Sequence, residues 1–85
     1  MDKFKEKIQS ALNKRGFQAS IEQIDDSNFI RVCAEKYGLI ARTGPFHRAY
    51  VISNPDEAAK TAVRQINDKV VLFLKLLFEE EDNGH

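Results

Sequence analysis

The sequence predicts an α+β domain of two layers with the element order α-β-β-β-β-α, in which a four-stranded antiparallel sheet has both helices packed on one face. Three observations lead to this prediction. Two segments, 2–15 and 55–80, have apolar side chains at helical spacing, the residues between them alternate apolar with polar side chains, and short turns separate the alternating stretches. Strands with one apolar face and helices with one apolar stripe bury both surfaces when they stack as two layers.

The first predicted helix covers residues 2–15. Its apolar side chains form one narrow stripe, made of Phe4, Ile8, Ala11 and Leu12. Asp2 is a residue type that caps the start of a helix, and Gly16 can adopt the left-handed conformation that ends one. We therefore expect the helix to stop at Gly16 and to pack on the sheet by this stripe.

Four short strands are predicted next, at 17–24, 29–34, 39–43 and 46–53. The segments between them have turn chemistry: Asp25-Asp26-Ser27-Asn28, Glu35-Lys36-Tyr37-Gly38 and Thr43-Gly44-Pro45. In the second turn, Gly38 occupies the position that needs a positive φ. Because these connections are short, consecutive strands should be antiparallel neighbours.

The last predicted helix begins at Asn54-Pro55-Asp56-Glu57, which supplies a capping residue, a proline at the first helical position and two acids at the positive helix end. We expect it to continue to about residue 80. A competing interpretation ends the helix at Asn67-Asp68 and makes 69–78 a buried strand, since its Val and Phe residues favour strands. Its Leu and Lys content favours the helix.

The second half of this helix is apolar almost all round. Its original apolar face continues, and a second stripe appears beside it at Val71, Leu74 and Phe78, with Lys75 in the remaining gap. A helix over 55–80 spans about 39 Å, whereas a seven-residue strand spans only about 23 Å. The helix should therefore extend past its own sheet, and the extension is the apolar part.

Something should cover this extension, because each large apolar side chain left in water forfeits about 1.5–3 kcal/mol. The first helix of the same chain, a second copy of the chain and a different protein are the three candidates. We favour the second copy, and predict a homodimer whose interface contains Val71, Leu74, Lys75 and Phe78. The globular domain should cover 1–80, and 81–85 should be a frayed acidic tail.

The sheet face away from the helices is a second candidate surface. Strand alternation should turn Phe29 and Arg31 outward on one strand and Arg48 and Tyr50 outward on another, with Arg42 beside them. Arginine pairs phosphate oxygens, and aromatic rings stack on unpaired bases. This face could bind single-stranded nucleic acid or another protein, although a solvated sheet face also favours such side chains.

Several function classes find no support in the sequence. Thirteen Lys and Arg residues balance thirteen Asp and Glu residues, so the chain lacks the bulk positive charge of many nucleic-acid-binding proteins. Cys33 and His47 have no orienting carboxylate at a known spacing, and the single cysteine and two histidines form no metal-ligand cluster. We expect no enzyme activity, no cofactor, no metal and no small-molecule substrate.

A cytoplasmic location is also expected. The longest predominantly apolar run, 70–78, in which eight of nine residues are apolar, is far shorter than the roughly 20 residues of a membrane-spanning helix. The first residues contain no apolar run of the kind found in signal peptides. A lone cysteine excludes an intramolecular disulfide and is typical of a reducing compartment. The sequence thus predicts a small non-enzymatic interaction module or regulator, with nucleic-acid binding as the alternative.

Overall fold

The computed structural model describes residues 1–25 and 28–83, with side chains described as far as Leu77. It contains four antiparallel strands in one sheet and three helices, which confirms the predicted α+β class. The elements in chain order are α1 (Asp2–Asn13), β1 (Gln18–Ile24), β2 (Phe29–Lys36), β3 (Leu39–Arg42), β4 (Phe46–His47), α2 (Arg48–Ser53) and α3 (Pro55–Asn83).

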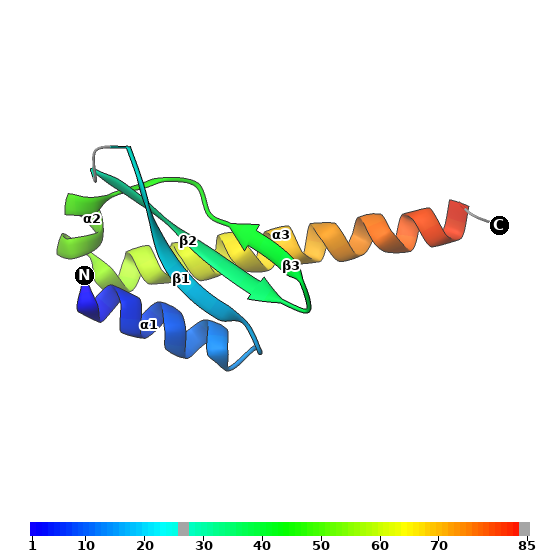
Figure 1. Ribbon diagram of the computed structural model, residues 1–85, viewed down its shortest axis with the longest axis horizontal. Helices are drawn as coiled ribbons and strands as arrows, with labels where there is room; N and C mark the ends of the chain where they lie inside the picture. Colours follow the sequence, from blue (N-terminus) through cyan, green and yellow to red (C-terminus); the bar gives the residue numbers. More distant parts are fainter. Residues whose placement is uncertain (26–27, 84–85) are drawn as a thin grey trace.

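The sheet has the order β1-β2-β3 (Figure 1), and β4 pairs with β2 rather than with β3. The pairing Cys33↔Arg42 and the pairing Ile30↔Phe46 differ by one residue in register. The chain from β3 to β4 is therefore one strand interrupted by a bulge at Thr43-Gly44-Pro45. The predicted break in this place is confirmed, and both pieces lie along the same neighbour.

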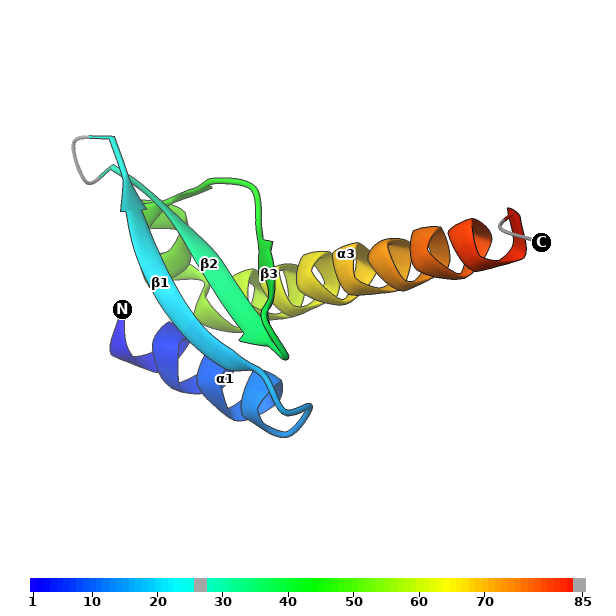
Figure 2. The same cartoon turned by 45° about the vertical axis from the view of Figure 1, so that its right-hand side comes forward.

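Both long helices cover the same face of the sheet. The even-numbered residues of β2 from Ile30 to Ala34 point into a core shared with α1 and α3, while its odd-numbered residues point away. Figures 1 and 2 show α1 and α3 running in the same direction behind the strands. The buried apolar side chains are Phe4, Ile8, Leu12, Phe17, Ile30, Val32, Ala34, Phe46, Val51, Ala58, Ala59, Ala62 and Ile66.

The end of α1 follows the sequence prediction closely. Gly16 has a φ of 84°, the amide of Gly16 donates to the carbonyl of Asn13, and the amide of Phe17 donates to the carbonyl of Leu12. This pair of bonds is the motif in which a left-handed glycine satisfies the last carbonyls of a helix. The predicted cap at the start is wrong, because Met1 is the N-cap and contributes no side-chain hydrogen bond.

The predicted strand 46–53 is largely wrong. Only Phe46–His47 is strand, and the chain then turns into α2. His47 caps this helix, since its Nδ1 accepts a hydrogen bond from the amide of Ala49 at 3.1 Å. Val and Ile residues favour strands, but tertiary packing overrides that preference here because one helical turn buries Val51 completely.

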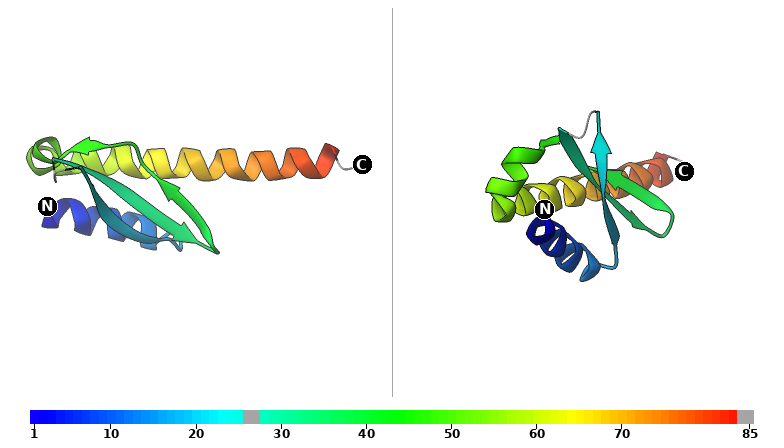
Figure 3. Two further views of the ribbon diagram at one scale, coloured as in Figure 1. Left: turned by 45° about the horizontal axis from the view of Figure 1, so that its top comes forward. Right: turned by 60° about the vertical axis from the view of Figure 1, so that its left-hand side comes forward.

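The prediction that residues 69–78 belong to the last helix is confirmed, and the strand interpretation is wrong. α3 has 29 residues, which corresponds to a length of about 44 Å. The whole molecule measures 51 × 27 × 20 Å, so α3 sets its long dimension. The left view in Figure 3 shows α3 continuing well past the sheet. Among the described residues, no helix combines the length and apolar character that crossing a membrane requires.

Candidate interaction surface

The extension of α3 beyond the sheet exposes large apolar side chains on every side. Six of the seven residues from 71 to 77 are large and apolar, and each is between 43% and 63% exposed. The seventh, Lys75, is also exposed. We call these residues the overhang: Val71, Leu72, Phe73, Leu74, Lys75, Leu76 and Leu77. A contiguous exposed apolar surface of this kind is a mark of an interaction site.

The overhang continues onto the end of the sheet through two shallow hollows. One hollow, of about 340 Å³, lies between β3 and α3, with Leu39 on one wall and Phe73 on the other. The second, of about 260 Å³, lies beside it between Tyr37 and Leu74. Both hollows are lined by Phe17 and Val70. The apolar surface therefore reaches from the β2–β3 hairpin to the free part of α3.

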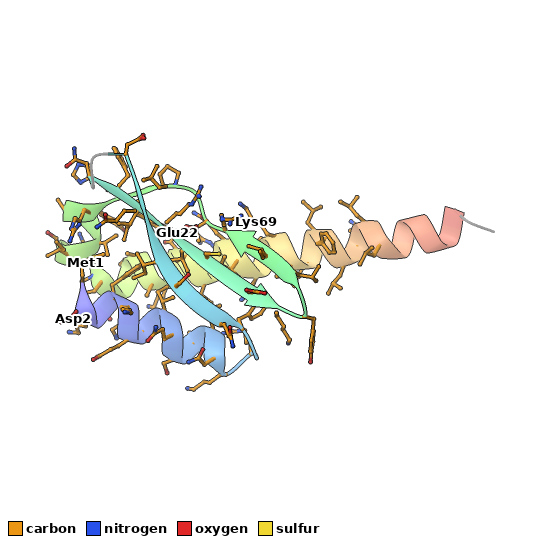
Figure 4. The ribbon with its side chains drawn as sticks, in the orientation of Figure 1. Met1, Asp2, Glu22 and Lys69 are labelled. Atoms are coloured by element: carbon orange, nitrogen blue, oxygen red, sulfur yellow. The ribbon has the colours of Figure 1, made fainter. Side chains whose placement is uncertain are left out.

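The junction between sheet and overhang is held by a charged side chain. Lys69, on the last turn of α3 that still faces the sheet, donates a hydrogen bond from its Nζ to the carbonyl of Arg42 in β3 (Figure 4). This bond ties the edge strand β3 to the helix at the point where the overhang begins. Ile66 belongs to the core and Val70 packs against it, so the part of α3 just before the overhang is anchored to the domain.

The predicted interface residues lie on this surface. Val71, Leu74 and Lys75 are all exposed on the overhang. The side chain of Phe78 lies outside the described residues, although its backbone belongs to α3. The first helix does not cover the stripe, because α1 ends at Asn13 and Val71 and Leu74 remain exposed. The candidate cover from within the chain, the first helix, is therefore not seen on this part of the stripe.

A groove between α1 and α3 lies on the same side of the helix as this stripe. It has a volume of about 700 Å³ and a floor of small apolar side chains, including Ala11 and Ala59. Charged residues form its walls: Lys7, Arg15, Asp56, Lys60, Arg64 and Asp68. Nζ of Lys7 lies 2.6 Å from Oδ1 of Asp56 and, by hydrogen bonding, lowers the pKa of that carboxyl. With this pair neutralised, the other wall residues comprise three bases and one acid.

The predicted arginine face is assembled only in part. Phe29, Arg31 and Arg42 point away from the helices as expected, because each pairs with another outward residue across the sheet. Both arginines, however, share one carboxylate: Oε1 of Glu22 accepts from Nε of Arg31 at 3.0 Å and from Nε of Arg42 at 3.1 Å. One negative charge therefore offsets two positive charges at the centre of this face (Figure 4).

The pKa of Glu22 reflects this arrangement. Desolvation raises the pKa, but the hydrogen bonds and the charges of Arg31 and Arg42 together hold it below its ordinary value. The carboxylate is consequently ionised at neutral pH and stays bound to both guanidinium groups.

The other two residues predicted for this face lie elsewhere. Arg48 and Tyr50 belong to α2, which leaves the sheet after His47. Phe46, at the start of the same predicted strand, is buried against the core, with its ring centroid 6.4 Å from that of Phe4. Two of the five side chains expected on the sheet face, Arg48 and Tyr50, are thus absent from it.

Comparisons of the chain with protein-family models, with curated proteins and with solved structures found no match.

Cys33 and His47 are not arranged as a catalytic pair. Cys33 pairs with Arg42 across the sheet, while Nδ1 of His47 is occupied by the cap of α2 and its ring stacks edge-on against Phe29 at 5.2 Å. Within the described ranges, no group of three or more His, Cys, Asp or Glu side chains could hold a metal ion.

Sequence reasoning missed Glu22 as the partner of both arginines. Its position in β1 is directly opposite Arg31, in a register that continues to Ile24↔Phe29 next to the turn. The alternation of β1 already placed Glu22 on the wet face. The signal that could have found the pair is this alternation combined with a tight connection after Ile24.

Proposed function

We propose that this protein is a non-enzymatic interaction module that associates with a second copy of itself through the stripe of Val71 and Leu74 on the overhang of α3. The observation that supports the proposal is the exposure of six large apolar side chains on seven consecutive residues, at the end of a helix that the domain holds in place. Covering such side chains contributes about 1.5–3 kcal/mol each when they become fully buried. The proposal includes a cytoplasmic location, which suits the lone unpaired Cys33.

A homodimer suits this surface because two identical overhangs can cover one another. Closed two-fold symmetry is the commonest form of self-association, and it lets the same patch serve both partners. The acids at 79–82 follow the apolar run directly in the sequence. Their charge keeps the free chain soluble before it associates.

Sedimentation equilibrium over a wide concentration range tests the proposal. The wild-type chain should have a dimer mass, and Leu74→Lys should give a folded monomer with an unchanged far-ultraviolet circular dichroism spectrum. Leu76→Lys is the matched control, since Leu76 is exposed on the same helix but lies on the side away from the predicted stripe. A wild-type monomer at all concentrations would contradict the proposal.

Nucleic-acid binding remains the alternative proposal for the sheet face. Arg31 and Arg42 are adjacent there, but Glu22 neutralises part of their charge. Glu22→Gln removes that carboxylate and should increase retention of a labelled single-stranded oligonucleotide at low salt, because phosphate affinity follows accumulated positive charge. If neither the wild type nor this variant retains the oligonucleotide, the alternative is removed.

A further inference from the structure

The predicted stripe on the overhang is the apolar half of a longer heptad pattern along α3. Positions 60, 64, 67, 71, 74, 78 and 81 follow one another at alternating steps of four and three residues, as the core positions of a coiled coil do. The first half of the pattern is polar and basic, with Lys60, Arg64 and Asn67. Val71 and Leu74 begin the apolar half, and the sequence has Phe78 and then Glu81 in the last two positions.

The described positions of the pattern, from Lys60 to Leu74, lie on one accessible side of the helix. Lys60 and Arg64 are exposed, Asn67 is half-buried, and all three line the α1–α3 groove. Val71 and Leu74 continue the line onto the overhang. The groove and the stripe therefore form one track along α3, bordered by Lys7 and Ala11 of α1 at its start and by Tyr37 of the β2–β3 turn beside Leu74.

We propose that two copies of the chain pair their α3 helices antiparallel along this track, with Val71 of one copy packing on Leu74 of the other. The inference rests on the proposed self-association and adds its orientation and register. If Val71 of one copy faces Leu74 of the other in an antiparallel pair, the residue numbers of any two facing core positions add up to 145. Arg64 of one copy then faces position 81 of the other, which is a glutamate in the sequence.

Charge selects this orientation over the parallel one. In a parallel pair each core position faces its own copy, so Arg64 would face Arg64 and Lys60 would face Lys60. Like charges at core positions are unfavourable, and buried charges need a partner of opposite sign. The antiparallel pair instead brings the acidic end of one helix to the basic start of the track on the other. Arg15, which follows α1 and lines the groove, adds a further positive charge there.

The residues that flank the core positions are also complementary. The two-fold axis is perpendicular to the plane that contains both helix axes. Residues on one flank of the first helix therefore lie on the same side of that plane as the equivalent residues of the second helix. In this register Lys75 of one copy lies beside Asp68 of the other, with an offset along the helix axis of two residues, or about 3 Å. Both side chains are exposed in the single chain, and the symmetry makes this opposite-charge pair twice. On the other flank, Val70 lies beside Leu77, which is an apolar pair.

A charge-reversal cycle tests the orientation and the register together. Lys75→Asp should weaken dimerisation about tenfold, because two attractive pairs become repulsive. Asp68→Lys should weaken it similarly, and the double variant Lys75→Asp with Asp68→Lys should regain most of the wild-type affinity. Lys5→Asp is the matched control: it makes the same change in net charge on an exposed position of α1 outside the track. Dissociation constants come from sedimentation equilibrium at low salt.

The outcomes separate this inference from the proposed function. Recovery in the double variant, with no effect of Lys5→Asp, supports the antiparallel register. If the wild type is a dimer but the double variant loses as much affinity as the two single variants combined, the register is overturned and the proposed self-association stands. A wild-type chain that stays monomeric at every concentration overturns both. Circular dichroism of each variant verifies that a loss of mass does not come from unfolding.

Discussion

Nε of Arg31 lies 3.0 Å from Oε1 of Glu22, directly across the antiparallel pair of β1 and β2. The same oxygen lies 3.1 Å from Nε of Arg42 in β3, so one carboxylate joins three neighbouring strands on the outer face of the sheet. Surface ion pairs between single partners contribute little. A carboxylate shared by two arginines in fixed strand register forms a small network, and its main consequence is for the pH dependence of stability.

Glu22→Gln should reduce the acid sensitivity of the fold. The folded-state pKa of Glu22 lies below its ordinary value of 4.5, so the unfolded chain binds a proton more readily as the pH falls. The stability contributed by this carboxylate is therefore complete above about pH 4.5 and is lost as the pH falls through the lower folded-state pKa. Urea unfolding at several pH values should show Glu22→Gln less stable than the wild type at neutral pH, with the difference shrinking in acid.

Glu35→Gln is the control for this measurement. Glu35 is an exposed residue of β2, and the described part of the chain shows no ion pair for it. A wild type and a Glu22→Gln variant whose stabilities fall in parallel between neutral and acid pH would contradict the assigned role of Glu22.

Substitutions in α2 distinguish the helix from the strand that the sequence predicted. A strand over 46–53 with Val51 inward would also bury Ala49, whereas α2 leaves Ala49 exposed. Ala49→Gln should therefore change the free energy of unfolding by less than about 0.5 kcal/mol. Val51→Ala should cost about 1–2.5 kcal/mol, because Val51 is fully buried. Chemical denaturation gives both values, and a large loss for Ala49→Gln would favour the strand.

The parts of the fold that were predictable are those that local chemistry determines. Gly16 ends α1 and Gly38 closes the β2–β3 hairpin because both positions need a positive φ, which glycine adopts easily. Pro55 starts α3 because the amide hydrogen that proline lacks has no partner at a first helical position. The segment 46–53 was not predictable in this way. Its alternation is too short to separate a strand from one and a half helical turns, and His47 became a cap only because β4 pairs with β2.

The same distinction between local and tertiary causes explains which candidate surface was predictable. The overhang was predictable from the length of the last helix, the length of a strand and the helical period. These three quantities placed Val71, Leu74 and Lys75 in advance. The arginine face depended on the strand at 46–53, and it lost Arg48 and Tyr50 when that segment became helical. The neutralising role of Glu22 depended on a cross-strand register that the sequence alone leaves open.

Tyr37, in the turn of the β2–β3 hairpin, has a strained backbone conformation that a substitution should relieve. Tyr37 has a φ of 53° and precedes Gly38, whose φ is 79°, so the two-residue turn needs positive φ at both positions. Tyr37 is 92% exposed, and Asn is the residue favoured at its position. Tyr37→Asn should therefore raise the free energy of unfolding by a few tenths to about 1 kcal/mol.

Gly38→Ala is the complementary change in the same turn. A Cβ at this position meets open space, so any loss comes from the backbone conformation and not from a clash. We expect a loss of about 1 kcal/mol in urea unfolding. Equal stability of Gly38→Ala and the wild type would show that the turn can relax to another type.

Thr43 should be needed for its hydroxyl and not for its shape. It is the buried polar residue of the described core, at the bulge between β3 and β4. The amide of Val32 donates to Oγ1 of Thr43 at 3.0 Å, and the hydroxyl donates in turn to the carbonyl of Gly44 at 2.8 Å. The bulge removes the regular backbone acceptor opposite Val32, so the side chain of Thr43 takes its place.

Two substitutions separate the hydroxyl from the methyl group of Thr43. Thr43→Val keeps the shape but leaves the buried amide of Val32 without an acceptor, which should cost about 1–3 kcal/mol. Thr43→Ser keeps the hydroxyl and loses one methyl group, which should cost about 1 kcal/mol or less. Urea unfolding of the three proteins should therefore rank the wild type first, Ser second and Val last. If Val is as stable as Ser, the hydrogen bond to Val32 does not hold the bulge, and packing of the side chain alone does.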